Sequence, residues 1–257
     1  MGEGARVFRF NDRNDLVAHT ARLLVDRLVD LQGEGSRRVQ LCVSGGPVAF
    51  DAYGLMAEII PSTSLDRDLV EVWWSADCFV ATDDDRRVSL RTLGRLAGAA
   101  SPRSANTHPI PSSDDFDDPE EAAFHYAQDL SEITLDVCLL ELSPTGQVAG
   151  LFPGHVVTDA TVMGIADDDD GPCAACPDYV TLTPRGINAA REVWIIASGA
   201  DSAESVATAT AGQAAGEVAE PGVPLAAPAR YLHGAQWSCW LVDEGAATLL
   251  PQHHCQL

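Results

Sequence analysis

Apolar residues recur along this chain in two patterns, short continuous runs and one helical stripe. Leucines at 16, 23, 24, 28 and 31 fall mostly on one face of a helix that Asn11 or Asp12 would cap. The continuous runs are VQLCV (39–43), LVEVWW (69–74), LDVCLLEL (135–142), EVWIIAS (192–198) and CWLV (239–242). The stripe predicts an amphipathic helix, and the runs predict buried strands.

Further helices are expected between these strands, at residues 48–60, 88–99, 119–132, 201–211 and 243–250. Apolar strands that alternate with helices are typical of a mostly parallel sheet covered by helices on both faces. A chain of 257 residues can bury a full core. We therefore expect an α/β fold with a single domain over residues 1–257, whose ligands bind at the carboxyl ends of the strands.

The charge of the chain restricts its partners. Acidic residues number 38 and basic residues 16, which gives a formal net charge of −22, and none of the basic residues is lysine. Mechanisms that need a lysine are therefore excluded. A strongly negative field opposes binding to nucleic acid and to anionic membranes, because phosphate affinity depends on cations. Salt adaptation and an arginine-rich codon usage would both produce this composition.

Neither a membrane span nor a signal peptide is evident. No run approaches the roughly 20 apolar residues that cross a bilayer. The first residues, MGEGARVFRFNDRND, lack a basic start followed by an apolar stretch. We expect a soluble, cytoplasmic protein.

The seven cysteines do not indicate a metal site. Cys173 and Cys176 form a C-x-x-C motif, but zinc needs two further ligands, and only the terminal HHC (253–255) offers any. A loop that happens to hold two thiols is the simpler interpretation. Neither a metal nor a cofactor is expected. Three other cysteines lie in apolar runs, where a thiol commonly serves as a small hydrophobic residue: Cys42, Cys138 and Cys239.

Three strand ends carry candidate chemistry. After the first strand, a serine and two glycines precede a helix, an arrangement that can direct backbone N–H groups at an anion: Ser44, Gly45 and Gly46. The second strand leads into SADCFVATDDDRRV, which holds Asp77, Arg86 and Arg87. The third leads into LSPTGQVAGLFPGH, which holds Gly146, Gln147 and His155.

In this order, the three segments resemble the 6-phosphogluconolactonase family, which is related in fold to glucosamine-6-phosphate deaminase and ribose-5-phosphate isomerase. YVTLTPRGINAAREVWIIASGADSAESVATAT (179–210) and PARYLHGAQWSCWLVDEGAATLL (228–250) are similar to later blocks of the family. The resemblance thus covers nearly the whole chain. It implies a Rossmann-like sheet and, for the family, hydrolysis of 6-phosphoglucono-1,5-lactone to 6-phosphogluconate in the pentose-phosphate pathway.

The reactive positions of that family are altered in this chain. The family's Asp-Glu-Arg corresponds to Ala76-Asp77-Cys78. In the third loop, the family's acidic residue, histidine and serine correspond to Thr145, Gln147 and Gly150. Two upstream glycines are replaced by Glu141 and Ser143. The family's arginine and lysine fall at Asp178 or Tyr179, and at Ser202.

These replacements predict a change of function. Glutamine cannot accept a proton at a useful pH, so Gln147 at the family's base position can hydrogen-bond a ligand but cannot activate water. Fewer cations also weaken the binding of a sugar phosphate. We therefore predict a pseudoenzyme with lost or greatly reduced lactonase activity. It would bind a sugar phosphate or related ligand weakly, in a binding or regulatory role with a possible protein partner.

Two alternatives remain open, and with them whether the chain is an enzyme. One is an active hydrolase or isomerase on a different sugar-like ligand, with Asp77 or His155 as a relocated base. The other is a true lactonase that tolerates the changes. Nothing in the sequence gives the pKa of Asp77 a reason to rise, and an exposed loop is the simpler interpretation of His155. The expected ligand-binding residues are Ser44, Gly45, Gly46, Arg87, Gly146 and Arg230.

Overall fold

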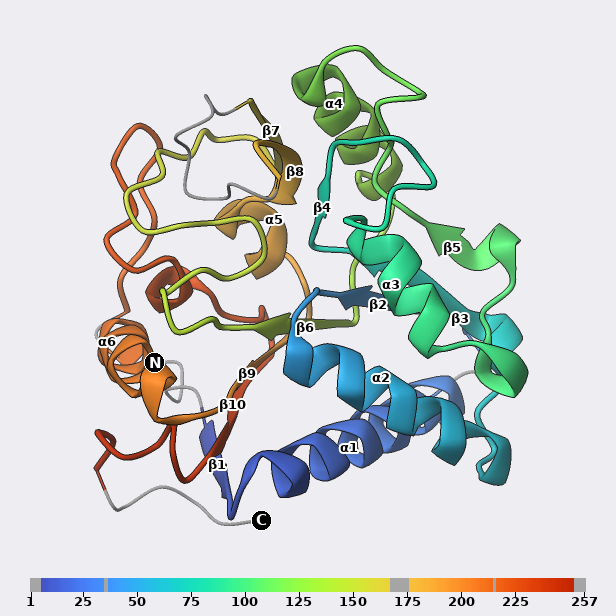
Figure 1. Cartoon of the computed structure of the whole chain (residues 1–257), viewed down its shortest axis with the longest axis horizontal. Coiled ribbons are helices and arrows are strands. Elements are labelled where there is room, and N and C mark those ends of the chain that lie inside the picture. The colour runs from blue at the N-terminus through green and yellow to red at the C-terminus, as the bar shows by residue number, and fades with distance from the viewer. Residues whose placement is uncertain (1–5, 35–36, 167–175, 215, 252–257) are drawn as a thin grey trace.

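A seven-stranded parallel sheet forms the centre of the molecule. The computed structural model describes residues 6–34, 37–166, 176–214 and 216–251 (Figure 1). Neighbouring strands are parallel throughout, in the order β1-β10-β9-β6-β2-β3-β5. The strands are β1 (Arg6–Phe10), β2 (Val39–Val43), β3 (Val70–Trp74), β5 (Thr107–His108), β6 (Val137–Glu141), β9 (Glu192–Ala197) and β10 (Trp237–Asp243). The predicted mostly parallel α/β fold is confirmed.

The central strands are covered on both faces, which explains their continuous apolar sequences. Every residue of β3 and of β9 is buried. The three cysteines of the apolar runs are free and buried, as predicted: Cys42, Cys138 and Cys239. Burial raises the pKa of the Cys42 and Cys239 thiols, so these groups stay protonated within the core.

Helices flank the sheet. The longest, α1 (Arg13–Gly33), begins after Asp12, whose carboxylate accepts a hydrogen bond from Asp15 N at 2.9 Å. In Figure 1, α1 and α2 lie on one side of β9 and β10, and α6 lies on the other. The remaining helices are α2 (Pro47–Ile59), α3 (Val88–Arg95), α4 (Pro119–Leu130), α5 (Pro184–Asn188) and α6 (Ala203–Ala214). Short 3-10 helices occupy Ile60–Ser62, Arg67–Leu69, Gly98–Ala100, Ser104–Asn106, Ala200–Ser202 and Pro228–Tyr231.

A second, antiparallel sheet stands beside the main one. It consists of β4 (Ala76–Cys78), β8 (Asp178–Leu182) and β7 (Val162–Ala166), in that order. Helix α4 packs against β7 and β8. Because β4 follows β3 with only Ser75 between them, the chain leaves the main sheet directly above its carboxyl edge. The sequence did not predict this small sheet.

Two of the expected helices differ in the structure. The helix predicted at 88–99 ends at Arg95. The prediction of a helix at 243–250 is wrong, because the chain forms turns after β10. There the Asp243 carboxylate accepts hydrogen bonds from Ala246 N at 2.8 Å and from Gly199 N at 3.0 Å. These bonds close a turn after β10 and tie it to the loop that follows β9. Among the described residues, no helix has the length and apolarity needed to cross a membrane.

Candidate active site

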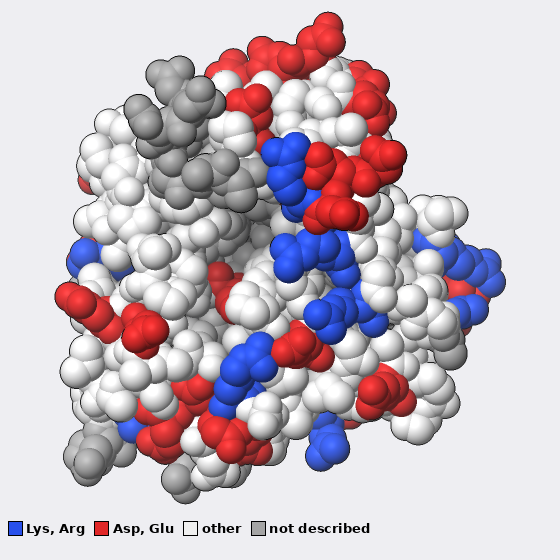
Figure 2. Space-filling view, in the orientation of Figure 1, with Lys and Arg blue, Asp and Glu red and all other residues white. Residues whose placement is uncertain are grey.

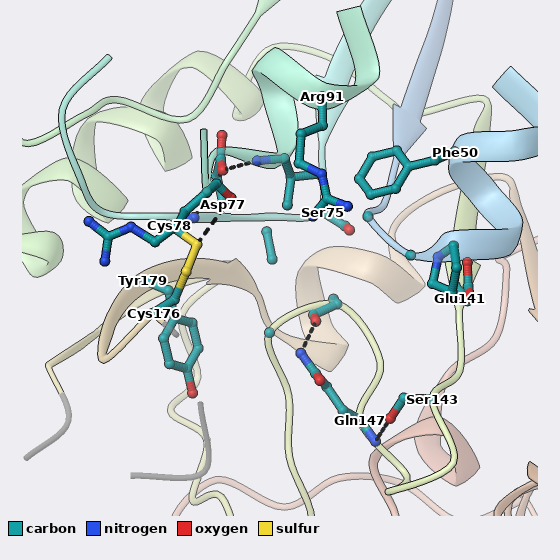
Figure 3. Close-up of a pocket in the computed structure, with 18 of the residues that line it drawn as sticks. Phe50, Ser75, Asp77, Cys78, Arg91, Glu141, Ser143, Gln147, Cys176 and Tyr179 are labelled. Carbon is teal, nitrogen blue, oxygen red and sulfur yellow. Dashed lines mark hydrogen bonds between the residues drawn. A yellow bond between two sulfur atoms is a disulfide. The ribbon is translucent and has the colours of Figure 1, made fainter. Parts of the chain in front are cut away.

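A cleft of about 400 Å³ opens at the carboxyl ends of β2, β3 and β6, where the sequence placed the site (Figure 3). One wall is helix α3, another is the small sheet, and the floor includes Ser75. Figure 2 shows a hollow in the face of the molecule with basic side chains gathered along one rim. The lining is largely apolar, from Pro47, Phe50, Val88, Ala149 and Phe152.

The turn after β2 is already filled by a carboxylate of the chain itself. Glu141, the last residue of β6, accepts hydrogen bonds from Ala49 N (2.8 Å to Oε2) and Val48 N (3.3 Å to Oε1) at the start of α2. A Cβ at Gly46, whose φ is 136°, would lie 2.2 Å from Oε2, so only glycine permits this approach. Beneath the turn, Ser44 is buried, and its Oγ accepts a hydrogen bond from Glu141 N at 3.0 Å. Glu141 therefore occupies the helix start, next to the Ser44–Gly46 turn, where an external anion was expected.

The proton affinity of Glu141 is unusual for a carboxylate. Burial raises its pKa to about 7, against the hydrogen bonds from Ala49 and Val48 and the charge of Arg13, which lower it. Glu141 therefore titrates in the neutral pH range, well above an ordinary glutamate. A cleft carboxylate with a pKa near neutrality is suited to exchange protons with a ligand. In the sequence, Glu141 stands out only as the replacement of a family glycine.

Asp77 lines the cleft, but its carboxylate is engaged in the fold. It accepts hydrogen bonds from Val88 N at 2.7 Å and Ser89 N at 3.3 Å, at the start of α3. Arg87 Nη2 lies 3.2 Å from its Oδ2. Burial raises the pKa of Asp77, with Arg87 and Ser89 opposing. The expectation that this pKa has no reason to rise is wrong, because only 2% of the residue is exposed.

Arg87 lies away from the cleft, contrary to its predicted role as a ligand-binding residue. Its guanidinium is buried between the Asp77 carboxylate, Ser89 Oγ at 3.2 Å and the carbonyl oxygen of Ile110, to which it donates. A buried guanidinium needs such partners to offset its desolvation. Arg87 thus holds the start of α3 in place, and it is Arg86 that reaches the lining.

In the loop after β6, Gln147 lines the cleft as predicted. Its Nε2 donates a hydrogen bond to the carbonyl of Ala149 at 3.2 Å, and its backbone N donates to Ser143 Oγ at 3.1 Å. Gly146 faces the other way, toward Pro153 and Ser205. A Cβ at Gly150 would lie 2.8 Å from the Thr181 Cβ, so a serine would not fit there without movement of β8. The loop thus presents an amide to the cleft.

His155 and Arg230 do not line the cleft. The ring nitrogens of His155 lie 3.3 and 3.4 Å from Tyr179 Oη, and the residue borders a separate hollow beside β7. Arg230 forms an ion pair with Glu217 and packs against Gly212 of α6. The structure therefore brings together Gly45, Gly46, Asp77 and Gln147, with Ser44 beneath them. It places Gly146, Arg87, His155 and Arg230 elsewhere.

One wall of the cleft contains a disulfide bond. Cys78 of β4 is bonded to Cys176, with the Cα atoms 5.5 Å apart (Figure 3). The interpretation of Cys176 as a loop thiol is therefore wrong; Cys173 and the terminal HHC (253–255) lie outside the described residues. Within the described ranges, no group of His, Cys, Asp and Glu is arranged to hold a metal ion. Disulfides persist in oxidising surroundings, so the predicted cytoplasmic location stays a prediction.

Two further cleft residues, Ser75 and Arg91, were not singled out from the sequence. The guanidinium of Arg91 lies over the Phe50 ring, 4.3 Å from its centroid, and Arg91 has no carboxylate partner among the described residues. Ser75 is fully buried, and its Oγ has no hydrogen-bond partner. Only their positions relative to the strands could have indicated these two residues. Ser75 is the first residue after β3, and Arg91 lies one turn into the helix that follows.

Comparison with known proteins identifies the family of this chain. The model of the family described as glucosamine-6-phosphate isomerases/6-phosphogluconolactonase matches residues 11–244. A 6-phosphogluconolactonase of Streptomyces coelicolor is 31% identical over 271 residues, which covers 98% of this chain and 97% of that protein. The 6-phosphogluconolactonase of Mycobacterium tuberculosis is 31% identical over 254 residues, covering 94% of this chain and 97% of that protein.

Solved structures show the same fold at lower sequence identity. The 6-phosphogluconolactonase of Thermotoga maritima superposes with a TM-score of 0.76 at 19% identity, covering 93% of this chain and all of that one. A monomeric glucosamine-6-phosphate deaminase gives a TM-score of 0.76 at 16% identity, with 95% of this chain and 99% of that one covered.

Proposed function

Since the chain belongs to the family of glucosamine-6-phosphate isomerases and 6-phosphogluconolactonases, we propose that it is a ligand-binding member whose hydrolysis of 6-phosphoglucono-1,5-lactone is lost or greatly reduced. Its relatives carry the name of the lactonase, so hydrolysis of that lactone is the activity to test. The observation that carries the proposal is the Glu141 carboxylate bound to Val48 N and Ala49 N at the start of α2.

The electrostatics of the cleft oppose a sugar phosphate. A helix N-terminus that ends in a glycine turn attracts anions, but here Glu141 takes that place. Of the two arginines that line the described cleft, Arg86 is paired with Asp84 at 2.7 Å. A phosphate dianion would therefore meet a carboxylate at the turn and one arginine without an acidic partner, in a protein of net charge −22.

The general-base positions also favour loss of hydrolysis. Gln147 cannot accept a proton, and Asp77 is held by Arg87 and the start of α3. His155, the nearest imidazole along the chain, lies outside the cleft lining. Activation of water by a general base typically accelerates a reaction 10² to 10⁴-fold, and none of these three side chains is placed to supply it. A binding or regulatory role with a protein partner is the part of this proposal that interaction experiments must establish.

A second candidate, a hydrolase or isomerase acting on a less anionic, sugar-like ligand, is favoured by Glu141. Its carboxyl group lines the cleft, and its pKa of about 7 lies in the range in which a general base works best. In that case Glu141 takes the role that the sequence analysis assigned to Asp77 or His155. The two candidates differ in whether removal of Glu141 abolishes a measurable rate.

The test is hydrolysis of freshly generated 6-phosphoglucono-1,5-lactone by the purified chain, against the spontaneous rate in the same buffer. We expect the two rates to be equal. The variant Glu141→Gly/Thr145→Asp/Gln147→His frees the turn and returns an acid and an imidazole to the loop, and it should exceed the spontaneous rate. Hydrolysis by the unaltered chain above background would overturn the proposal. If Glu141→Gln then removed that rate, the chain would be an active lactonase with Glu141 as its general base.

A further inference from the structure

We propose that the cleft binds a small monocarboxylate with an apolar body, whose carboxylate is held by Arg91 above the hydroxyl of Ser75. The inference deepens the proposed function, because it takes the same cleft as a binding site and names the chemical class of its ligand. The proposed polar contacts come from Arg91 of the α3 wall and Ser75 of the floor, and Glu141 at the turn after β2 enters only through its charge.

Arg91 is already positioned to receive an anion. Its guanidinium carbon lies 4.3 Å from the centroid of Phe50, so the ring fixes the plane of the group. The other arginines around α3 have acidic partners: Arg86 pairs with Asp84, Arg87 with Asp77, and Arg95 with Asp51 at 3.7 Å. Arg91 has no such partner in the described part of the chain. A planar guanidinium held in this way matches the geometry of a carboxylate.

Ser75 supplies an unused hydroxyl at the floor of the same cleft. Its backbone is fixed on both sides, since its N–H donates to Val43 O at 2.9 Å and its carbonyl accepts from Leu182 N at 2.8 Å. Its Oγ is buried without a partner, and Figure 3 shows Arg91 reaching down toward it from α3. An unpaired buried hydroxyl is costly and is commonly explained by a group missing from the structure. A ligand oxygen held by Arg91 would supply that partner.

The charge balance selects a monoanion. One guanidinium without an acidic partner can neutralise one negative charge, while Glu141, which also lines the cleft, repels further charge when it is ionised. A phosphate ester, which is largely dianionic at neutral pH, would need a second cation. A carboxylate carries one charge and two oxygens, and it can bind a guanidinium through both.

The remaining lining selects an apolar body. Pro47, Phe50, Val88, Ala149 and Phe152 line the same cleft as Arg91. A cleft of about 400 Å³ accommodates a ligand of small-molecule size. Polyol hydroxyls placed against these side chains would lose water without gaining hydrogen bonds. An aromatic or branched carboxylate would instead extend the stack begun by Arg91 on Phe50.

The experiment is calorimetric titration of the purified chain with phenylacetate, gluconate and inorganic phosphate at pH 7. Phenylacetate represents the proposed class, gluconate is a polar monocarboxylate, and phosphate represents the anion expected at the family's turn. We expect phenylacetate to bind at least 10-fold more tightly than either of the others. Equal binding of all three, or binding of phosphate alone, would overturn the proposal.

Two arginines on α3 make a matched pair of variants. Arg91→Gln removes the proposed contact and should weaken phenylacetate binding at least 10-fold. Arg95→Gln removes the same charge one turn along the helix, outside the cleft lining, and should leave affinity within 2-fold. Equal losses in both variants would mean a general charge effect and overturn the site. Both positions are exposed, and thermal unfolding should confirm that both variants fold.

Ser75→Ala tests the floor of the site. It should weaken phenylacetate binding several-fold while the melting temperature stays level or rises, because the variant loses an unpaired buried hydroxyl. Unchanged affinity would exclude Ser75 from the site. The lactone assay is independent of these titrations: absent hydrolysis with no phenylacetate binding overturns this ligand class alone, and hydrolysis with phenylacetate binding overturns only the loss of activity.

Discussion

Asp77 and Glu141 face the same cleft, and each accepts two hydrogen bonds from the first turn of a helix. Asp77 binds the start of α3 and Glu141 the start of α2. Burial raises the pKa of both. They differ in their counter-charges. Arg87 is buried against Asp77, whereas Arg13, the cation that acts on Glu141, is itself paired with Asp51 at 2.7 Å.

This difference separates a structural carboxylate from a titratable one. The Asp77–Arg87 pair is enclosed, so losing either member leaves the other charge buried alone. Glu141 has no buried cation of its own: backbone N–H groups, the dipole of α2 and an Arg13 that is paired with Asp51 stabilise its charge, so it becomes neutral near pH 7 instead. Two carboxylates with nearly the same backbone contacts therefore have different roles. The variants below test that distinction in order of decreasing effect.

The largest effect is expected from Asp77→Ala. It leaves the buried Arg87 guanidinium without its carboxylate and frees the N–H groups of Val88 and Ser89, so stability should fall by about 3–5 kcal/mol. Urea unfolding at pH 7 measures the loss. The matched control is Asp84→Ala in the same segment, which breaks the exposed pair with Arg86 and should change stability little. Equal losses in the two variants would show that Asp77 is no more structural than a surface acid.

Breaking the disulfide should have the next largest effect. Cys78 adjoins Asp77, and its bond to Cys176 spans 98 residues of sequence, so the bond restricts the unfolded chain strongly. Reduction should lower stability by about 2–4 kcal/mol. Because Glu141 lies on another wall, the change in stability between pH 5 and pH 8 should stay as it was.

Unfolding with and without reductant measures this effect. The control is the Cys78→Ser/Cys176→Ser variant, on which reductant should have no effect. If reductant leaves the stability of the unaltered protein unchanged, or if Cys78 and Cys176 are both alkylated without reductant, the disulfide does not form in solution.

The smallest effect, with the clearest pH dependence, belongs to Glu141→Gln. Between its usual pKa of 4.5 and its folded value of about 7, Glu141 keeps its proton in the folded protein and loses it on unfolding. Burial of Glu141 therefore lowers the free energy of unfolding increasingly as pH rises through this window, and the loss is complete above it. The glutamine variant should be more stable than the unaltered chain at pH 8, on the order of 2 kcal/mol, and nearly equal at pH 4.5.

Urea unfolding across pH 4.5 to 8 checks this prediction. Glu58→Gln is the matched control, since Glu58 lies on an exposed face of α2. A Glu141→Gln variant that is no more stable than the unaltered chain at pH 8 would contradict a raised pKa for Glu141.

The arrangement of the cleft was only partly foreseeable. The rule that ligands gather at strand ends pointed to Ser44–Gly46, to Asp77 and to Gln147. The structure places Gly45, Gly46, Asp77 and Gln147 in the cleft lining, with Ser44 buried beneath them. The same rule could not tell which way a side chain turns after the strand ends. Arg86 and Arg87 are adjacent in sequence, yet one lines the cleft and the other is buried under Asp77.

The sequence by itself determined the parallel sheet, its buried strands and the family, because apolar runs and ordered motifs are properties of the chain read in one dimension. Only the tertiary structure decided that Glu141 fills the turn after β2, that Cys78 is bonded to Cys176, and that the Arg91 guanidinium stacks over the Phe50 ring. Each of these contacts joins residues 41 or more positions apart in the chain. Their energies depend on distance and burial, which sequence spacing does not encode.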